Sequence, residues 1–366
     1  MVRSSTSRLG AIALGTAGVL ALAGCGATPE DGDSAGPVAS DFLPCIVSDS
    51  GGYNDHSFND SGLLGITNAA DELGVKFTKI ESTSDDDYTP NIDAAISAGC
   101  TLVVTIGFRL SDATLEAAKA NPDVQFAIVD DGLDKDGDGK PDVPNGKPIV
   151  FDTAQASFLA GYAAADTSKT GVVGTFGGMQ IPPVTLFMDG FVDGVAYYNE
   201  EKGASVKAIG WDKASQTGVF TGGFAAGVDA KTAAQNLLDQ NADVLLPVGG
   251  PIYQSAGEAI RDRGGDIALI GVDADVYETD PSVKELLLTS VMKGVAAGVH
   301  DVVVAASKGE FDNTPFIGTL ANDGIGIAPF HDWSSKVKST LQGDLDAVKA
   351  KIVSGELEIT SQSTPR

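Results

Sequence analysis

The sequence predicts an α/β protein built from two doubly wound parallel sheets that follow each other along the chain. From residue 42 onward, short apolar runs alternate with longer segments of helical periodicity. The apolar runs are nearly continuous in Val, Ile and Leu, a pattern typical of parallel strands buried on both faces. Because the alternation reaches about residue 130 and begins again near residue 147, we expect two similar lobes.

The first series contains four strand-like runs with helical segments between them. The runs are "FLPCIVSD", "VKFTKIES", "CTLVVTIG" and "VQFAIVDD". After the first run, the periodicity places one apolar face on a helix, made of Leu63, Ile66, Ala70 and Leu73. We assign residues 42–150 and 275–310 to the N-terminal lobe.

The second series begins at "KPIVFDT". Its further strand-like runs, again separated by helical segments, are "TGVVGTFGG", "SVKAIGW", "VLLPVGG" and "IALIGVDAD". After Asp275 come another strand, "LLLTSVMK", a long helix, "GVAAGVHDVVVAASKG", and a final helix within residues 334–359. We assign residues 151–274 and 311–366 to the C-terminal lobe, with a hinge between the lobes.

The first 24 residues have the layout of a secretory signal peptide. Arg3 and Arg8 precede an uncharged apolar stretch that is too short to span a membrane comfortably. The stretch ends in "LAGC", which resembles the bacterial lipobox and implies cleavage before Cys25 and acylation of that cysteine. Ordinary secretion with an incidental Cys25 is the alternative. Residues 25–41 are rich in Gly, Pro, Ser and acidic side chains, which predicts a flexible tether.

The chain is strongly acidic. Its formal charge is −26, and loss of Arg3 and Arg8 with the leader makes it −28. Such a chain is repelled by nucleic acid phosphates, which argues against a DNA or RNA partner.

Two cysteines remain in the body of the chain. Cys45 and Cys100 lie at or near the start of the first and third strand-like runs, which are neighbours in a doubly wound sheet. Export permits a disulfide between them, and closing a loop of this size contributes about 4 kcal/mol in the chain-entropy model. Two separate buried thiols are the alternative.

The ends of the predicted strands carry acidic residues and glycines. They are Asp49 to Gly52, Gly107 and Phe108, Asp130 and Asp131, Gly177 and Gly178, Gly249 and Gly250, and Asp273. In parallel α/β sheets the carboxyl ends of the strands line the ligand crevice. Glycine there lets the backbone approach a ligand, and a carboxylate accepts hydrogen bonds from hydroxyl groups. Six such ends from two series predict a shared cleft.

Signatures of catalysis are few. None of the three histidines has a metal-ligand or triad partner at a recognisable spacing: His56, His300 and His331. The sequence also lacks G-x-S-x-G, H-E-x-x-H and a Walker lysine after its glycine-rich loops. We therefore expect a binding protein that is not an enzyme and has no cofactor.

The stretch "SDSGGYNDHSFNDSG" after the first strand combines a helix start with an unusual aromatic pair. Read locally, "SFND" is a capping box with Ser57 as N-cap and Asp60 three residues on. That reading leaves Asp55, Phe58 and Asn59 without a local role on the turn that faces the cleft.

Several longer motifs resemble one known family. They are "GGYNDHSFND", "GGMQIPPVTLFMDGFVDGV", "FTGGFAA", "VLLPVGG", "IGVDAD" and "LTSVMKGV". In this order and spacing they resemble the basic membrane protein family of ABC-transporter substrate-binding lipoproteins, whose best understood type is a purine nucleoside receptor. The likeness extends from residue 43 to about residue 330. It implies the type I periplasmic-binding fold, with two lobes, three crossovers and a hinge that closes on a ligand.

The resemblance also implies roles for individual residues. Phe58 and Phe224 would stack on the two faces of a purine, and Asp55, Asn59 and Asp130 would bind base edges or close the cleft. Gly249 would offer its backbone to the sugar, and Asp273 and Lys293 would hold the ribose hydroxyls. From its place at a strand end, Asp49 is also expected to bind the ligand. Lobe core for the two phenylalanines and a hinge cap for Asp273 are the alternatives.

Partners and location follow from the same resemblance. It implies a monomer anchored by lipid outside the cytoplasm, which passes its ligand to an ABC permease with its ATPase. A sugar or another small polar molecule is the alternative ligand. A signalling receptor on the same fold is the alternative function, and a nucleoside-cleaving enzyme is a further one.

The chain departs from the family pattern at "DKDGDGKPD". Asp134, Asp136, Asp138 and Asp142 match a D-x-D-x-D-G calcium loop up to its ninth position, but Asn145 replaces the glutamate expected at the twelfth. A structural calcium site and a solvated acidic turn are both open interpretations.

Overall fold

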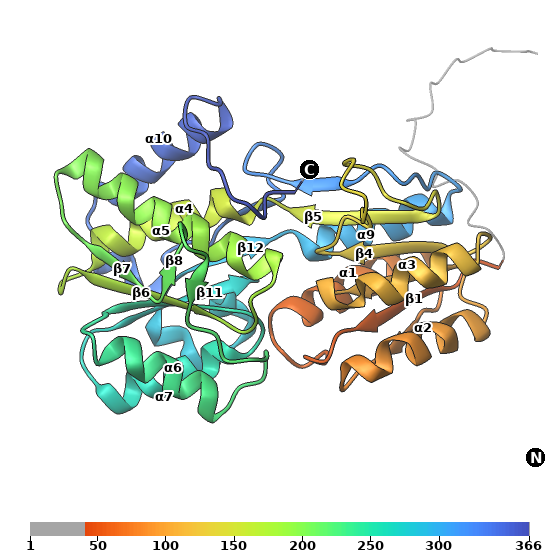
Figure 1. The fold of residues 1–366 in the computed structure, drawn as a ribbon, viewed down its shortest axis with the longest axis horizontal. Helices are drawn as coiled ribbons and strands as arrows, with labels where there is room; N and C mark the ends of the chain where they lie inside the picture. The colour runs from red at the N-terminus through yellow and green to blue at the C-terminus, as the bar shows by residue number, and fades with distance from the viewer. Residues whose placement is uncertain (1–40, 366) are drawn as a thin grey trace, which may run out of the picture. The chain divides into compact units, whose positions relative to one another are not determined.

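The computed structural model describes residues 41–365, and the body of the chain forms one compact unit. The predicted signal peptide, the predicted acylation site at Cys25 and nearly all of the predicted tether lie outside the described residues. Two six-stranded sheets form the framework. Helices flank both, as Figure 1 shows, so the predicted fold class is confirmed.

The first sheet has the strand order β13-β5-β4-β3-β1-β2, and all its pairings are parallel. Its strands are β1 (Pro44–Ser48), β2 (Thr78–Ile80), β3 (Leu102–Ile106), β4 (Gln125–Val129), β5 (Gly146–Phe151) and β13 (Phe316–Gly318). Along β1, Ile46 joins one buried cluster while Cys45 and Val47 join another. The strand is therefore covered on both faces, which explains its unbroken apolar sequence.

Helices pack against both faces of the first sheet and bury β1. The first cluster includes residues of α1 (Phe58–Leu73) and α9 (Val295–Ser307), which pack against each other. The second includes residues of α2 (Tyr88–Ser97) and α3 (Ser111–Ala120). Short 3₁₀ turns precede α2 and α3, at η1 (Asp85–Asp87) and η2 (Phe108–Leu110).

The second sheet has the order β14-β12-β11-β10-β6-β7, with β14 antiparallel to β12. Its strands are β6 (Val172–Gly177), β7 (Lys207–Ile209), β10 (Val244–Val248), β11 (Ala268–Asp273), β12 (Leu287–Lys293) and β14 (Ile325–Ile327). In Figure 1, α4 (Thr153–Thr167) and α5 (Pro182–Lys202) lie on one side of this sheet, and α6 (Val228–Leu238) and α7 (Ile252–Arg263) on the other.

Smaller elements complete the second sheet's lobe. A two-stranded hairpin joins β8 (Trp211–Asp212) to β9 (Thr217–Gly218), and α8 (Val276–Thr279) and η3 (Pro281–Leu286) connect β11 to β12. After β14 come η4 (His331–Ser335) and α10 (Leu341–Val353). The final helix is thus shorter than the predicted range 334–359.

Two expectations about the lobes need correction. The run "KPIVFDT", predicted to begin the second series, forms β5, which pairs with β4 in the first sheet, in agreement with the assignment of residues up to 150 to the N-terminal lobe. Residues 275–293, assigned to the N-terminal lobe, end in β12 of the second sheet, whereas β13 returns to the first. Both errors have one cause, because an apolar strand signals that it is buried without showing which sheet buries it. The lobes are residues 41–151 with 294–318, and residues 152–293 with 319–365.

Three segments cross between these lobes, as the family resemblance implies. They follow β5, β12 and β13. Because only three strand ends join the lobes, relative motion of the lobes needs backbone changes at a few positions, as in other hinged proteins.

The two cysteines of the body are joined in a disulfide. Strands β1 and β3 are neighbours, as predicted, with Cys45 opposite Val103. Cys100 lies two residues before β3, and the Cα atoms of the two cysteines are 5.9 Å apart. The bond therefore links the amino ends of two central strands, far from their carboxyl ends.

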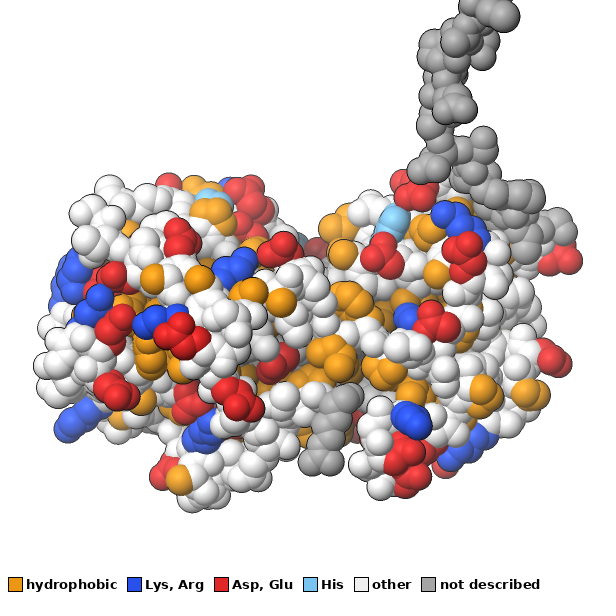
Figure 2. All heavy atoms as spheres, turned by 90° about the horizontal axis from the view of Figure 1, so that it is seen from above, with side chains coloured by type: hydrophobic (Ala, Val, Ile, Leu, Met, Phe, Trp, Pro, Cys, Tyr) orange, Lys and Arg blue, Asp and Glu red, His pale blue; other side chains and the backbone are white. Residues whose placement is uncertain are grey.

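Charged side chains are spread over the surface. In the view of Figure 2, Asp and Glu side chains form small separate groups, interspersed with fewer Lys and Arg side chains. On that face the negative balance of the chain is therefore not gathered into one patch.

Candidate functional site

One pocket lies at the carboxyl ends of strands from both sheets. It occupies about 560 Å³, including its open mouth. All nine residues expected to bind a ligand line it: Asp49, Asp55, Phe58, Asn59, Asp130, Phe224, Gly249, Asp273 and Lys293.

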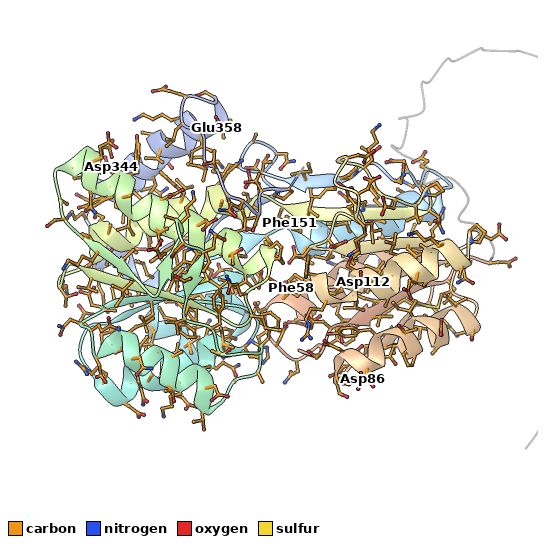
Figure 3. The ribbon with its side chains drawn as sticks, in the orientation of Figure 1. Phe58, Asp86, Asp112, Phe151, Asp344 and Glu358 are labelled. Atoms are coloured by element: carbon orange, nitrogen blue, oxygen red, sulfur yellow. A yellow bond between two sulfur atoms is a disulfide. The ribbon has the colours of Figure 1, made fainter. Side chains whose placement is uncertain are left out.

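The two phenylalanines reach the pocket from different lobes. Phe58 is the first residue of α1, and Figure 3 shows it where the two lobes meet. Phe224 lies on the segment between β9 and α6. Both side chains are half-buried against the edge of the core and line the same pocket. They are therefore not enclosed in the separate interiors of their lobes.

Two glycines fix the place of the Phe224 ring. A Cβ atom at Gly178 would come within 2.3 Å of the ring's Cδ1, and one at Gly249 within 2.5 Å. Gly249 also has φ of +126°, where other side chains are strained. Gly178, which follows β6, and Gly249, which follows β10, thus allow the ring to lie directly on the backbone.

Lys293, the last residue of β12, is the central cation of the pocket. Its Nζ lies 2.6 Å from Oδ2 of Asp130 and 3.6 Å from Oδ1 of Asp273. Asp130 follows β4 in the first sheet and Asp273 ends β11 in the second, so the lysine connects carboxylates of both lobes. Only 3% of its side chain is exposed.

Aromatic rings surround the same ammonium group. Nζ of Lys293 lies 4.9 Å from the ring centre of Phe58, 5.4 Å from that of Phe187 and 5.7 Å from that of Phe151. Cation–π attraction at these distances stabilises a buried ammonium group. The pocket therefore combines aromatic faces with two ion pairs, in which Lys293 joins Asp130 and Asp273.

Asp130 and Asp273, the two aspartates beside Lys293, have unusual backbone geometry. The φ angle is +71° at Asp130 and +70° at Asp273, in the left-handed region that residues other than glycine rarely occupy. Such strain concentrates at binding and active sites. Burial raises the pKa of Asp273 to about 6, although the nearby Lys293 lowers it.

Asp49 and Asn59 form a second polar pair in the pocket. Nδ2 of Asn59 donates to Oδ1 of Asp49 at 2.7 Å, and the backbone N–H of Gly51 donates to the same oxygen at 2.9 Å. Burial raises the pKa of Asp49 to about 6 against these two hydrogen bonds. Oδ1 of Asn59 is buried and has no hydrogen-bond partner among the described residues. Within the described part of the chain this buried oxygen therefore has no protein donor, while Asn59 as a residue lines the pocket.

Asp55 caps α1, and the predicted capping box is wrong. Its Oδ1 accepts from the backbone N–H groups of Ser57 and Asp60, and its Oδ2 accepts from that of Asn59. Ser57 makes no side-chain cap bond. A carboxylate two residues earlier thus takes the free amides of the first turn. Through these bonds Asp55 holds Phe58 and Asn59 in place, and it lines the pocket itself.

Sequence reasoning missed part of the lining. Besides Gly107 and Phe108, expected at a strand end, the pocket includes Arg109, Ile181, Pro183, Val184, Phe187 and Val248. Four of these belong to the motif "GGMQIPPVTLFMDGFVDGV", whose position after β6 was the available signal. Arg109 follows β3, pairs with Asp85 and donates from Nη1 to Sδ of Met179 at 3.3 Å. It had no sequence signal beyond its place after a strand end.

The acidic loop lies outside this pocket. Carboxylate oxygens of Asp134, Asp136 and Asp138 lie within 4.8 Å of one another, and Asp142 is not part of the group. Asp134 accepts hydrogen bonds from the backbone N–H groups of Gly137, Asp138 and Gly139, which lower its pKa. Because backbone amides already satisfy this carboxylate, calcium at the loop remains a prediction.

Within residues 41–365, no helix is both long enough and apolar enough to cross a membrane.

Known proteins resemble the chain over nearly its whole length. The family model described as "ABC transporter substrate-binding protein PnrA-like" (Bmp) matches residues 43–363. The ABC transporter nucleoside-binding protein BmpA of Lactococcus lactis is 29% identical, over 96% of this chain and 97% of its own. Basic membrane protein A of Borreliella burgdorferi is 27% identical, over 89% and 90%.

A solved structure supports the fold independently. An ABC transporter solute-binding protein of Aeropyrum pernix K1 superposes with a TM-score of 0.77 at 24% identity. The match covers 89% of this chain and 94% of that one. At this identity the likeness shows the shared architecture of two lobes.

Proposed function

Because the chain belongs to the Bmp family of PnrA-like ABC transporter substrate-binding proteins, we propose that it binds a purine nucleoside between its lobes and delivers it to a membrane permease. The relative from Lactococcus lactis is named as a nucleoside-binding protein. Closure of the lobes on the ligand would be the state that the permease recognises.

The observation that carries the ligand class is the placement of Phe58 and Phe224. They come from different lobes and line one pocket. Two rings on opposite walls suit a flat base, and stacking on an aromatic side chain contributes about 1–3 kcal/mol for each base. Asn59 also lines the pocket, and its side-chain amide would bind a polar edge of the base.

The ion pairs of Lys293 with Asp130 and Asp273 are suited to binding the sugar of a nucleoside. Asp273 and Asp130 are held by Lys293 and keep acceptor capacity at the wall of the pocket. A carboxylate accepts two hydrogen bonds from a cis-diol, and the ammonium group balances its charge. This arrangement favours a ribonucleoside over a free base.

We infer a binding role without covalent chemistry, since the family consists of substrate-binding proteins of transporters. We further infer that the protein is exported, anchored through an acylated Cys25, and active as a monomer beside a permease and its ATPase. Residues 25–41 would then act as a tether between the membrane and the lobes.

A sugar is the second candidate ligand, because sugars also stack on aromatic rings and bind carboxylates through their hydroxyl groups. Calorimetric titration with guanosine, inosine, adenosine and ribose distinguishes the two. We expect the nucleosides to bind and ribose to bind at least about tenfold more weakly, since it lacks the stacked base. Binding of ribose with no binding of any nucleoside would reject the proposal.

Variants test the two rings directly. Phe58→Ala and Phe224→Ala should each weaken nucleoside binding by about 5- to 150-fold, which corresponds to about 1–3 kcal/mol. Phe77→Ala is the matched control, because Phe77 is also a half-buried ring at the edge of the core but does not line the pocket. Equal affinity in all three variants would mean that the rings do not hold the base.

A further inference from the structure

The lobes also touch each other beside the pocket, where the turn before α1 meets β11. Oγ of Ser57, in the N-terminal lobe, donates to the backbone oxygen of Val272 at 2.9 Å. It also lies 3.3 Å from Oδ2 of Asp273. Only 1% of Ser57 is exposed. This hydroxyl group therefore makes its hydrogen bonds across the two lobes and away from solvent.

A second hydroxyl group makes a contact in the opposite direction. Oγ1 of Thr279, the last residue of α8 in the C-terminal lobe, donates to the backbone oxygen of His56 at 2.7 Å. His56 has φ of +53°, a conformation that costs energy in a residue other than glycine. The strained turn at His56 and Ser57 is thus held by one donor from each lobe.

Neither hydroxyl group belongs to the wall of the binding pocket. Ser57 and Thr279 are absent from its lining, whereas Asp55 and Phe58 on either side of the turn are part of it. Both partners of each hydrogen bond are protein atoms. These bonds therefore contribute to the closed arrangement of the lobes whether or not a ligand occupies the pocket.

We propose that Ser57 and Thr279 form a latch that holds the lobes closed without contacting the ligand. A protein that must close around its ligand binds with an apparent affinity reduced by the scarcity of the closed form. The latch raises the closed fraction, and it thereby sets how much of the ligand's binding free energy is used for closure. It also slows dissociation, because the ligand leaves only after the latch opens.

Thr279 is the better position for a test. Ser57 also touches Asp273, so its removal would disturb a pocket residue together with the latch. Thr279→Val removes one hydroxyl group at nearly constant shape, and Thr279→Ser keeps that group. Thr289→Val is the matched control, since Oγ1 of Thr289 donates to the backbone oxygen of Ala328 at 2.6 Å within one lobe.

Two measurements test whether the latch holds the lobes together. The first uses the exported chain carrying Cys25→Ser, Asp86→Cys and Gln240→Cys, with spin labels on the two introduced cysteines, which are at exposed positions in different lobes. Pulsed electron resonance then gives the distance between the lobes without ligand. The second measurement gives the affinity and the dissociation rate of guanosine. This measurement rests on the proposed function.

In Thr279→Val we expect a shift of the distance distribution toward separated lobes and about two- to tenfold weaker binding of guanosine, mostly through faster dissociation. Thr279→Ser and Thr289→Val should behave like the parent in both measurements. The affinity loss should be the same factor for inosine, because the latch does not touch the base.

The proposal is overturned if Thr279→Val matches Thr289→Val in both the distance distribution and the ligand affinity. If neither guanosine, inosine nor adenosine binds the parent, the proposed function fails, and the distance distribution alone decides on the latch. A loss that differs strongly between guanosine and inosine would also overturn it, since it would place Thr279 in ligand recognition.

Discussion

Replacing Lys293 with methionine should destabilise the protein by about 3–5 kcal/mol and abolish nucleoside binding. The lysine lies 2.6 Å and 3.6 Å from two carboxylate oxygens, and the side chains that bear them are only 8% and 6% exposed. At an effective dielectric constant of about 20, each contact is worth several kcal/mol of Coulomb attraction before desolvation is subtracted. Methionine has nearly the volume of lysine but leaves two buried carboxylates without a cation. Loss of one partner of a buried ion pair typically destabilises a protein by about 3–5 kcal/mol, which is the loss that we expect.

The loss should depend on pH in a defined direction. Burial already raises the pKa of Asp273 to about 6, and Lys293 counteracts that rise. A carboxyl group with a folded-state pKa above its unfolded value destabilises the protein as pH increases through that interval, because the folded state must release a proton that the unfolded chain has already lost. Without the lysine the interval extends above pH 6. The stability difference between parent and variant should therefore be smallest near pH 5 and widen toward pH 8.

Urea unfolding of parent and variant at pH 5, 6.5 and 8 measures this effect. Lys231→Met is the matched control, because Nζ of Lys231 lies 2.7 Å from Asp262 but the side chains of this pair are 30% and 60% exposed. We expect that exposed pair to contribute no more than about 1 kcal/mol at any of the three pH values. If Lys293→Met unfolds at the same urea concentration as the parent at pH 8, the lysine does not balance buried charge.

Two further predictions concern the chain outside the pocket. Mass spectrometry of the exported protein should find Cys25 as an acylated N-terminal residue, and Cys25→Ser should leave the protein in the soluble fraction; an intact leader or an unmodified Cys25 would contradict this. If the loop at Asp134, Asp136 and Asp138 binds calcium, millimolar Ca²⁺ should raise the melting temperature, and Asp136→Asn should remove the increase. An unchanged melting temperature of the parent would reject the calcium hypothesis.

The candidate site was largely predictable because strand ends have a fixed meaning in parallel α/β sheets. Asp49, Asp130 and Asp273 each follow a buried apolar run, and such ends meet at the ligand crevice. The family motifs added Phe58 and Phe224, which no periodicity identifies. Arg109 and Phe187 were missed because an arginine after a strand and a phenylalanine in a helix have many other uses.

The local sequence pattern did not identify the N-cap of α1, because two neighbouring residues could both cap the helix. Ser57 and Asp55 are both good N-cap residues, and they lie two positions apart before the same helix. The choice depends on where the chain enters α1: the carboxylate of Asp55 meets the free amides, while the hydroxyl group of Ser57 meets Val272 of the other lobe. A partner from the other lobe, at a distant position in the sequence, therefore decided the role of Ser57.

By itself, the sequence determined the local properties of this protein: where its strands and most of its helices lie, and which strand ends carry ligand-binding chemistry. The tertiary structure alone decided which sheet β5, β12 and β13 join, which carboxylates surround Lys293, and where the lobes touch. The physical reason is that hydrophobic periodicity records whether a segment is buried, whereas the identity of its neighbours depends on chain reversals and packing between residues far apart in sequence.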